Sequence, residues 1–234
     1  MFITKDYLNM KDGFDWSRYF NENKESDFTS KLDIKEIYQN VRMYLKEDNI
    51  KMGFVIHQIL KKLLNSENIS SPAVLELGAA TGFLTRSILG LYNGMGVLVD
   101  KNRESNNQFN KLKDQKKLNI EYIINDIFEL DIKERFDIVC SFGLIEHFPN
   151  KKEVILIHSK FVKPNGKVLI IVPLDTPLSR AYFEVNPELN LGYRELLSKK
   201  EFIQELEQCN LKTVRTMTSF SYTYDFIAAL CILK

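Results

Sequence analysis

The middle of the chain alternates between short apolar runs and segments expected to be helical. The apolar runs occupy residues 73–78, 96–100, 119–126, 136–142 and 167–174. The segments expected to be helical lie at about 82–92, 102–117 and 151–162. Strands that are apolar on both faces and alternate with helices are typical of a parallel sheet covered by helices. The pattern therefore predicts an α/β fold.

The last part of the chain departs from this alternation. Residues 174–197 look irregular and carry several aromatic side chains, and a helix is expected at about 198–209. Two further apolar runs, 214–220 and 225–234, are separated only by Ser-Tyr-Thr-Tyr, which is too short for a crossover helix. We expect these two runs to form an antiparallel hairpin.

The segment before the first strand has a different character. Two stripes of apolar residues at helical spacing, 34–45 and 54–63, predict helices there. We therefore expect an N-terminal helical cap or lid over residues 1–66. The core would follow at 67–234, with residues 174–197 inserted as a lid over the substrate.

Composition narrows the class of protein. Among 234 residues, 32 are Lys or Arg and 31 are Asp or Glu, so the formal net charge is +1. This balance argues against a dedicated nucleic-acid binder, and the 44% apolar share excludes a disordered chain. Three cysteines without a metal-binding spacing, no evident signal peptide and no apolar run near ~18 residues predict a cytoplasmic protein with no membrane partner.

The strongest local signal is the loop after the first apolar run, VLELGAATGFLT (74–85). Small residues let a ligand approach the backbone, and the helix N-terminus offers N–H donors. A plain tight turn is the alternative. Ala80 and Phe83 stand where the dinucleotide fingerprint needs glycine, and the Gly-Lys-Ser/Thr of a phosphate loop is missing. The loop therefore favours a nucleoside ligand without phosphates.

Acidic residues end the next two predicted strands. Asp100 can accept the hydroxyls of a ribose, or it can cap the following helix. Asp126 can accept the amino group of an adenine that packs on Ile127, although many strands end in an Asn-Asp turn. The carboxyl ends of successive parallel strands lie at one edge of a sheet, so we expect these residues to share one ligand.

Together with FDIVCSFGLIEHF (136–148), these segments resemble the class I S-adenosylmethionine-dependent methyltransferases. ELGAATGFLT looks like their glycine-rich motif, VLVD like their ribose-binding motif, NDI like their adenine motif and KPNGKVLIIVPL like their fifth-strand motif. The resemblance covers about residues 70–175. It implies a Rossmann-like, doubly wound sheet of seven strands, mostly parallel with an antiparallel last strand.

The resemblance also implies which positions hold the cofactor, S-adenosylmethionine. The methionine part would lie against Glu76, Gly78, Ala79, Ala80, Thr81, Gly82 and Phe83. The adenosine would lie against Asp100, Lys101, Asp126 and Ile127, and the sulfonium and amino group would approach Ser141 and Phe142. Ala80 stands where glycine is commonest. Metal-dependent relatives carry an aspartate near the position of Ser141, so we expect no metal.

The chemistry implied is simple, because a sulfonium is already a strong methyl donor. The protein mainly has to align the acceptor, the methyl carbon and the sulfur. A hydroxyl acceptor also needs a general base, usually histidine, and His147 is the candidate. The alternatives are that His147 caps a turn or packs under the cofactor, and that proximity alone suffices. We expect His57 and His158 to be structural, with His158 on a surface helix.

Substrate selection is expected to come from residues added to the core. The candidates for substrate binding are Trp16, Tyr19, Arg180, Tyr182, Tyr193 and Arg194. Arginines among tyrosines would suit an anionic or aromatic substrate, and a closing lid would exclude water. The alternative is that these aromatic residues only pack the cap onto the sheet.

The sequence therefore predicts a metal-independent methyltransferase that acts on an oxygen or nitrogen atom of a small molecule, for example a specialised metabolite. No nucleic-acid partner is expected, and the protein would be a monomer or a homodimer. An RNA or protein methyltransferase and a catalytically silent S-adenosylmethionine-binding protein are the alternatives.

Overall fold

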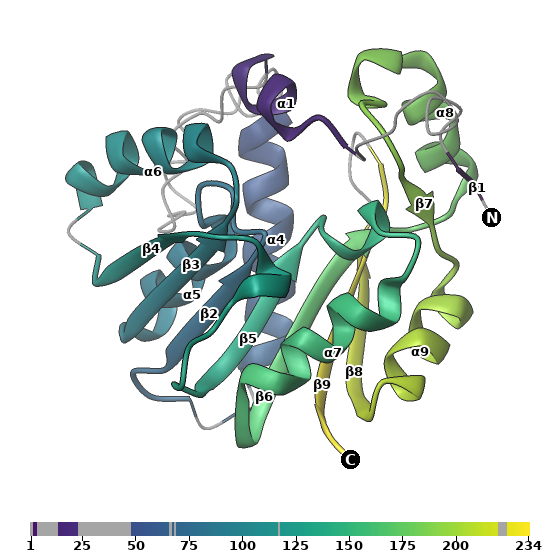
Figure 1. Cartoon of the computed structure of the whole chain (residues 1–234). Coiled ribbons are helices and arrows are strands. Elements are labelled where there is room, and N and C mark those ends of the chain that lie inside the picture. The colour runs from purple at the N-terminus through teal and green to yellow at the C-terminus, as the bar shows by residue number, and fades with distance from the viewer. Residues whose placement is uncertain are drawn as a thin grey trace.

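A seven-stranded sheet forms the centre of the molecule (Figure 1). The computed structural model describes residues 2–3, 14–22, 48–65, 67, 69–116, 118–219 and 224–234. The strand order is β4-β3-β2-β5-β6-β9-β8. The parallel strands are β2 (Ala73–Leu77), β3 (Met95–Asp100), β4 (Ile120–Ile124), β5 (Phe136–Phe142) and β6 (Val162–Pro173). The chain order reverses between β2 and β5, which is where ligands bind in open α/β sheets.

The last two strands form the predicted hairpin. β9 (Phe226–Leu233) lies between β6 and β8 (Leu211–Ser219) and is antiparallel to both. The predicted doubly wound sheet with an antiparallel last strand is therefore confirmed.

Helices cover both faces of this sheet (Figure 1). Side chains of α4 (Asp48–Leu64), α5 (Phe83–Tyr92) and α6 (Arg103–Lys116) pack on one face. The other face carries α7 (Lys151–Phe161) and α9 (Lys199–Gln208). Fully buried side chains such as Ile59 of α4 and Phe202 of α9 fill the two layers of the core. The helices expected at 82–92, 102–117, 151–162 and 198–209 are confirmed.

Residues 174–197 are more ordered than predicted. The helix α8 (Pro177–Val185) occupies much of this segment and is followed by the short helix η4 (Pro187–Leu189). Thr176 caps α8 by accepting a hydrogen bond from the Ser179 N–H, and Pro177 takes the first helical position, where its missing N–H costs nothing. The expectation of an irregular segment is therefore wrong, because Pro177 starts a helix.

Residues 14–22 lie over the carboxyl ends of the parallel strands. The helix α1 (Trp16–Glu22) crosses above this edge in Figure 1. The strand β1 (Phe2–Ile3) pairs antiparallel with β7 (Glu195–Leu196) from the insertion. The stripe predicted at 34–45 lies outside the described residues, and the boundary of the cap at residue 66 stays a prediction.

The structure also answers two questions about the cysteines and about membrane-spanning helices. The cysteines Cys140, Cys209 and Cys231 are all free and buried. Within the ranges given above, no helix combines the length and the apolar character needed to cross a membrane.

Candidate active site

The loop between β2 and α5 has an unusual backbone. Gly78, Ala80 and Gly82 have φ values of +60°, +48° and +72°. A Cβ atom at Gly78 would lie 2.5 Å from Cδ1 of Leu144, so that position has little room for a side chain. A left-handed conformation costs a residue with a Cβ roughly 1–2 kcal/mol, and Ala80 carries that strain.

The side chain of Glu76 forms hydrogen bonds to the first turn of α5, directly after this loop. The side chain is buried, and its carboxylate accepts hydrogen bonds from the N–H groups of Thr85 at 2.7 Å and Leu84 at 3.3 Å. Burial raises the pKa of Glu76 to about 7, although these hydrogen bonds lower it in part. The Glu76 carboxylate therefore satisfies the free N–H groups that open α5.

Asp100, at the end of β3, forms a hydrogen bond to the same loop. Its Oδ2 accepts the Ala80 N–H at 2.9 Å, and its Oδ1 accepts the Asn102 N–H at 2.8 Å. Burial is the main cause that raises the pKa of Asp100. The first turn of α6 is capped by Asn102 instead, whose Oδ1 accepts the Glu104 N–H at 2.8 Å. Asp100 is therefore not needed as the helix cap.

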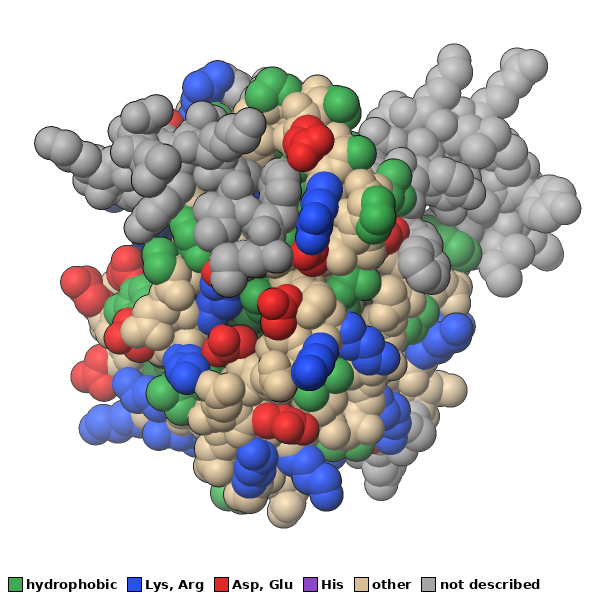
Figure 2. All heavy atoms as spheres, turned by 90° about the vertical axis from the view of Figure 1, so that its right-hand side faces the viewer, with side chains coloured by type: hydrophobic (Ala, Val, Ile, Leu, Met, Phe, Trp, Pro, Cys, Tyr) green, Lys and Arg blue, Asp and Glu red, His purple; other side chains and the backbone are tan. Residues whose placement is uncertain are grey.

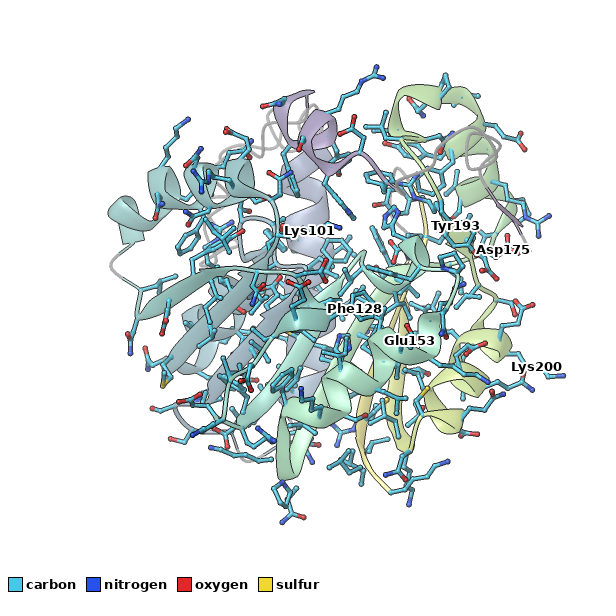
Figure 3. The ribbon with its side chains drawn as sticks, in the orientation of Figure 1. Lys101, Phe128, Glu153, Asp175, Tyr193 and Lys200 are labelled. Carbon is cyan, nitrogen blue, oxygen red and sulfur yellow. The ribbon has the colours of Figure 1, made fainter. Side chains whose placement is uncertain are left out.

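The strand ends enclose a cavity, which we call the strand-end cavity. Its lining residues are Trp16, Gly78, Asp100, Lys101, Asp126, Ile127, Leu144 and Phe148. Five of the residues predicted to bind the cofactor are thus brought together here. Lys101 Nζ lies 3.8 Å from Asp126 Oδ2, and Figure 3 shows Lys101 at this edge of the sheet. Asp126 Oδ1 accepts the N–H of Phe128 in the short helix η2 (Ile127–Glu129).

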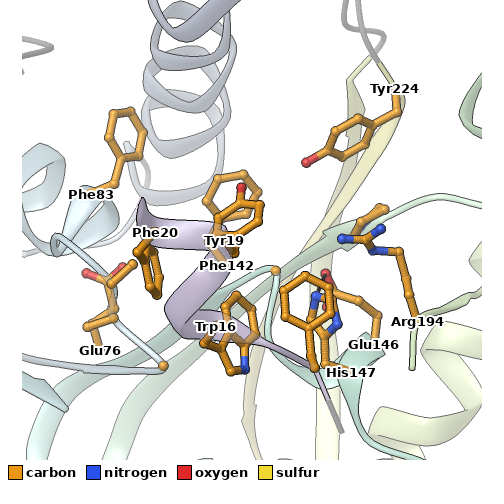
Figure 4. A pocket seen from close by; sticks show the side chains of 16 residues that line it. Trp16, Tyr19, Phe20, Glu76, Phe83, Phe142, Glu146, His147, Arg194 and Tyr224 are labelled. Atoms are coloured by element: carbon orange, nitrogen blue, oxygen red, sulfur yellow. Dashed lines mark ion pairs between the residues drawn. The ribbon is translucent and has the colours of Figure 1, made fainter. Parts of the chain in front are cut away.

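Figure 4 shows a second cavity, which we call the aromatic cavity. Its aromatic lining consists of Phe14, Trp16, Tyr19, Phe20, Phe83, Phe142 and Tyr224. Its remaining lining residues are Glu76, Gly78, Ala79, Ala80, Gly143, Glu146, His147, Pro173 and Arg194. Trp16 and Gly78 line both cavities, so the two spaces meet at these residues.

Three of the predicted substrate-binding residues line the aromatic cavity, namely Trp16, Tyr19 and Arg194. Arg180 is directed elsewhere and forms a two-pronged ion pair with Asp175, at 2.6 and 2.7 Å. The ring of Tyr182 stacks against Tyr224, with the ring centres 5.3 Å apart.

Three predicted cofactor residues, Thr81, Gly82 and Ser141, line neither cavity. The Ser141 side chain points to the opposite face of the sheet and bonds to Nε2 of His158 at 2.9 Å. His158 is fully buried on the inner side of α7, whose outer side is exposed at residues such as Leu156. Thr81 is buried, and its carbonyl oxygen accepts a hydrogen bond from Nε of Arg86. A side-chain contact between Ser141 and the cofactor therefore has no support in this geometry.

His147 lies in the short helix η3 (Ile145–His147), just after β5. Its Nδ1 atom lies 2.9 Å from the carbonyl oxygen of Tyr193, and its ring packs against Phe14 and Trp16 with centres 4.2 and 4.8 Å apart. Burial, and then the nearby Arg194, hold the pKa of His147 well below 6.5. The imidazole is therefore neutral at physiological pH.

Glu146 is a functional candidate that the sequence analysis missed. Its side chain is buried, and Oε2 has no hydrogen-bond partner among the described residues. Burial raises the pKa of Glu146 to about 7. Its Oε1 lies 3.8 Å from Nε2 of His147. The available signal was an acidic residue inside the mostly apolar stretch FGLIEHF, directly after a buried strand.

Arg194 places a positive charge beside these groups. Its guanidinium donates to the carbonyl oxygen of Leu189 at 3.0 Å and lies 4.3 Å from the ring centre of Phe183. Burial lowers the pKa of Arg194. In Figure 4 the guanidinium of Arg194 and the carboxylate of Glu146 both face the aromatic cavity.

A buried ion pair supports this wall of the cavity. Lys151, at the start of α7, pairs with Glu195 of β7, and the hydroxyl of Tyr193 donates to the same carboxylate. Figure 3 shows Tyr193 at the insertion side of the sheet edge. Because the Tyr193 carbonyl accepts from His147, this network fixes the backbone that orients the imidazole. Across the described residues, no group of three or more His, Cys, Asp or Glu side chains could hold a metal ion.

A family model described as a methyltransferase domain matches residues 70–216, which is more than half of the chain. The chain belongs to the S-adenosylmethionine-dependent methyltransferases. The predicted family is thereby confirmed, together with S-adenosylmethionine as the methyl donor of that family.

Two known enzymes illustrate the sequence similarity of this methyltransferase. It is 32% identical over 108 residues to the mitochondrial ubiquinone biosynthesis O-methyltransferase of Dictyostelium discoideum, covering 42% of this chain and 34% of that protein. The aligned part is thus about a third of the length of that relative. It is 27% identical over 208 residues to the ubiquinone/menaquinone biosynthesis C-methyltransferase of Blochmanniella pennsylvanica, covering 80% and 82% of the two chains.

The fold of this methyltransferase is shared with a solved structure. The magnesium protoporphyrin IX methyltransferase of Synechocystis PCC 6803, crystallised with S-adenosylhomocysteine, superposes with a TM-score of 0.67 and 12% identity. The match covers 98% of this chain and 97% of that one. At this identity the likeness shows the fold alone.

Proposed function

We propose that this methyltransferase transfers the methyl group of S-adenosylmethionine to an oxygen or nitrogen atom of a small aromatic molecule. The observation that carries the proposal is the junction of the two cavities at Gly78 and Trp16. A nucleoside in the strand-end cavity would direct its methionine part past Gly78 into the aromatic cavity. The methyl group would then face the acceptor.

The residues of the strand-end cavity fit an adenosine. Each Asp100 carboxylate oxygen already accepts one backbone N–H and keeps a lone pair for a ribose hydroxyl. Asp126 and Ile127 follow β4 and would contact the adenine, with Lys101 beside them. Gly78 lines both cavities and carries no side chain, so the methionine part could approach its backbone closely.

The aromatic cavity supports a small-molecule substrate. Its walls include side chains from α1, β5 and the insertion, and aromatic rings bind planar apolar groups well. The face seen in Figure 2 carries acidic and basic side chains interspersed with one another, which does not favour a nucleic-acid surface there. A space that adjoins the cofactor side also favours an enzyme over a silent binding protein.

The chain itself would contribute binding, orientation and the exclusion of water. When bound, S-adenosylmethionine supplies an activated methyl group. The aromatic rings of Phe14, Trp16 and Tyr19 line the cavity, so the acceptor would react beside apolar groups and away from bulk water. The neutral imidazole of His147 keeps a lone pair on Nε2 that can orient the hydrogen atom of the acceptor. Alignment of the acceptor with the methyl group is worth several kcal/mol, up to ~7–11 in favourable cases.

Calorimetry with S-adenosylhomocysteine tests the cofactor site. The wild-type protein should bind, and Asp100→Asn should weaken binding by roughly 10- to 100-fold, since hydrogen bonds to a charged group are worth about 1.5–3 kcal/mol. Asp131→Asn, at an exposed acidic residue, is the matched control and should leave the affinity unchanged. No binding by the wild type would contradict the proposal.

An activity assay with different acceptors tests the substrate class. Release of S-adenosylhomocysteine from S-adenosylmethionine should be measured with a panel of phenols, anilines, RNA and peptides. Turnover with an aromatic small molecule supports the proposal. Turnover with RNA or peptides alone would favour the macromolecular alternative.

A further inference from the structure

We propose that Glu146 receives the proton of the methyl acceptor, and that the substrate therefore presents a phenolic O–H group to Oε2 of this residue. The proposal rests on the proposed function and sharpens it, because it names the substrate class and the residue that selects it.

The position of the Glu146 carboxylate carries the proposal. It follows β5 at the carboxyl end of the sheet, lines the aromatic cavity and is only 2% exposed. Its Oε2 has no hydrogen-bond partner among the described residues. A buried polar atom without a partner costs about 1–3 kcal/mol, so such an atom in a cavity calls for a ligand that donates a hydrogen bond. A phenolic O–H group in this cavity supplies that donor, whereas an ether oxygen does not.

His147 is less suited to the same role. Its Nδ1 is committed to the carbonyl oxygen of Tyr193, and burial makes its imidazole a weak base. Its Nε2 lies 3.8 Å from Oε1 of Glu146, so both groups face one region of the cavity. We assign His147 as a positioning residue, because its ring, held by Tyr193 and packed on Phe14 and Trp16, forms the wall of the cavity beside the carboxylate.

The charges around Glu146 suit a proton acceptor. Arg194, Lys151 and its own backbone N–H favour the ionised form, while burial opposes it, and the result is a pKa of about 7. His147 and Tyr224 also face this carboxylate and are neutral. A general base works best when its pKa is close to the working pH.

Proton transfer to Glu146 accompanies the transfer of the methyl group. The phenolic O–H bond breaks and its proton goes to Oε2 of Glu146, while the oxygen forms a bond to the methyl carbon. The bond from that carbon to sulfur breaks, and its electron pair stays on the sulfur, which becomes a neutral thioether. The proton later leaves Glu146 for water as the products depart.

Binding of phenol and anisole to the protein saturated with S-adenosylhomocysteine tests the proposal. The two probes differ because anisole has no O–H group. Calorimetry at pH 8 should show that the wild type binds phenol at least tenfold more tightly than anisole. Glu146→Leu should bring this ratio close to one. Glu153→Gln, on the outer face of α7, is the matched control and should keep the wild-type ratio.

The pH dependence gives a readout that a merely structural residue would not change. The wild-type affinity for phenol should rise as the pH increases through about 7, because the ionised carboxylate is the better acceptor. In Glu146→Gln, which keeps the shape of the side chain, the affinity should not vary between pH 6 and 8. For any phenol that is methylated, this variant should lose roughly 10²- to 10⁴-fold in kcat.

Cofactor binding tests the proposed function, and the preference for phenol over anisole tests the role of Glu146. Failure of S-adenosylhomocysteine to bind the wild type contradicts the proposed function. If it binds, a ratio of phenol to anisole affinity near one in the wild type overturns the role of Glu146. The role of Glu146 is also overturned if neither probe binds to the wild type. It is likewise overturned if folded Glu146→Leu keeps the wild-type ratio, or if folded Glu146→Gln keeps the wild-type pH dependence.

Discussion

The Nδ1 atom of His147 lies 2.9 Å from the carbonyl oxygen of Tyr193. A carbonyl oxygen can only accept, so Nδ1 must carry the hydrogen and Nε2 must carry the lone pair. The contact joins the helix after β5 to the insertion and thereby sets both the tautomer and the orientation of the ring.

This contact predicts the NMR signature of His147. Nitrogen-15 spectra at pH 6.5 should show a neutral ring protonated at Nδ1, because burial and Arg194 keep its pKa well below 6.5. The signal is assigned by its loss in His147→Gln. A positively charged imidazole at this pH would contradict the assignment of His147 as a neutral residue.

His158 should make the protein sensitive to acid. Burial lowers its pKa to about 4, while the unfolded chain titrates near 6.5. The unfolded state therefore binds the extra proton first. The contribution of His158 is complete above pH 6.5 and is lost as the pH falls toward 4, by about 3 kcal/mol in total.

Denaturant unfolding of the wild type and His158→Gln at several pH values checks this dependence. The variant should be less stable at pH 7 and should lose less of its remaining stability on acidification. Glu76 and Glu146 act in the opposite direction in both proteins, because their pKa values are raised to about 7. Equal pH slopes for the two proteins would show that His158 is not the acid-sensitive group.

Ala80→Gly should stabilise the protein. The φ of Ala80 is +48°, and removing its Cβ relieves roughly 1–2 kcal/mol of strain, against about 0.5–1 kcal/mol of added chain entropy. We expect a net gain of about 0.5–1 kcal/mol in the free energy of unfolding. Ala79→Gly is the control and should destabilise, since Ala79 is a buried residue of the core without a positive φ. A loss of stability in Ala80→Gly would contradict the strain.

Trp16 should report cofactor binding directly. It is the single tryptophan of the chain and lines both cavities. S-adenosylhomocysteine should therefore change the intrinsic fluorescence, with a midpoint equal to the Kd from calorimetry. Trp16→Phe should remove most of the signal while calorimetry still detects binding. A fluorescence unaffected by saturating ligand would place the ligand away from α1.

The buried pair of Lys151 and Glu195 should be costly to break. Lys151→Met or Glu195→Leu alone leaves one charge buried without its partner, which destabilises by roughly 3–5 kcal/mol. The double variant should recover much of this loss, because both charges are then gone. Chemical denaturation of the three variants provides the comparison, and additive losses in the double variant would contradict coupling of the two residues.

Local signals in the sequence were enough for the sheet and its helices. The central parallel strands β2, β3 and β5 are mostly apolar on both faces. The small residues around Gly78 indicate a loop that a ligand can approach closely. Asp100 and Asp126 could be placed together because parallel strands end at the same edge. The hairpin of β8 and β9 followed from the short connection between them.

The side chains of the insertion could not be placed from sequence. Arg180 pairs with Asp175 and Tyr193 turns toward Glu195, and nothing in the local pattern indicates these partners. Glu146 was overlooked for the same reason, since its importance depends on walls contributed by Phe14 and Arg194 from distant segments. The direction of Ser141 was accessible in principle, because alternation along β5 puts it opposite Phe142.

The pairing of Phe2 and Ile3 with Leu196 and Glu195 has a practical consequence for handling the protein. An affinity tag fused directly ahead of Phe2 would lie next to β7, which directly follows Arg194 in the chain. A tag after Lys234 would lie at the far end of the sheet, as Figure 1 shows. Ligand-binding experiments on the C-terminally tagged or untagged chain would therefore leave this strand undisturbed.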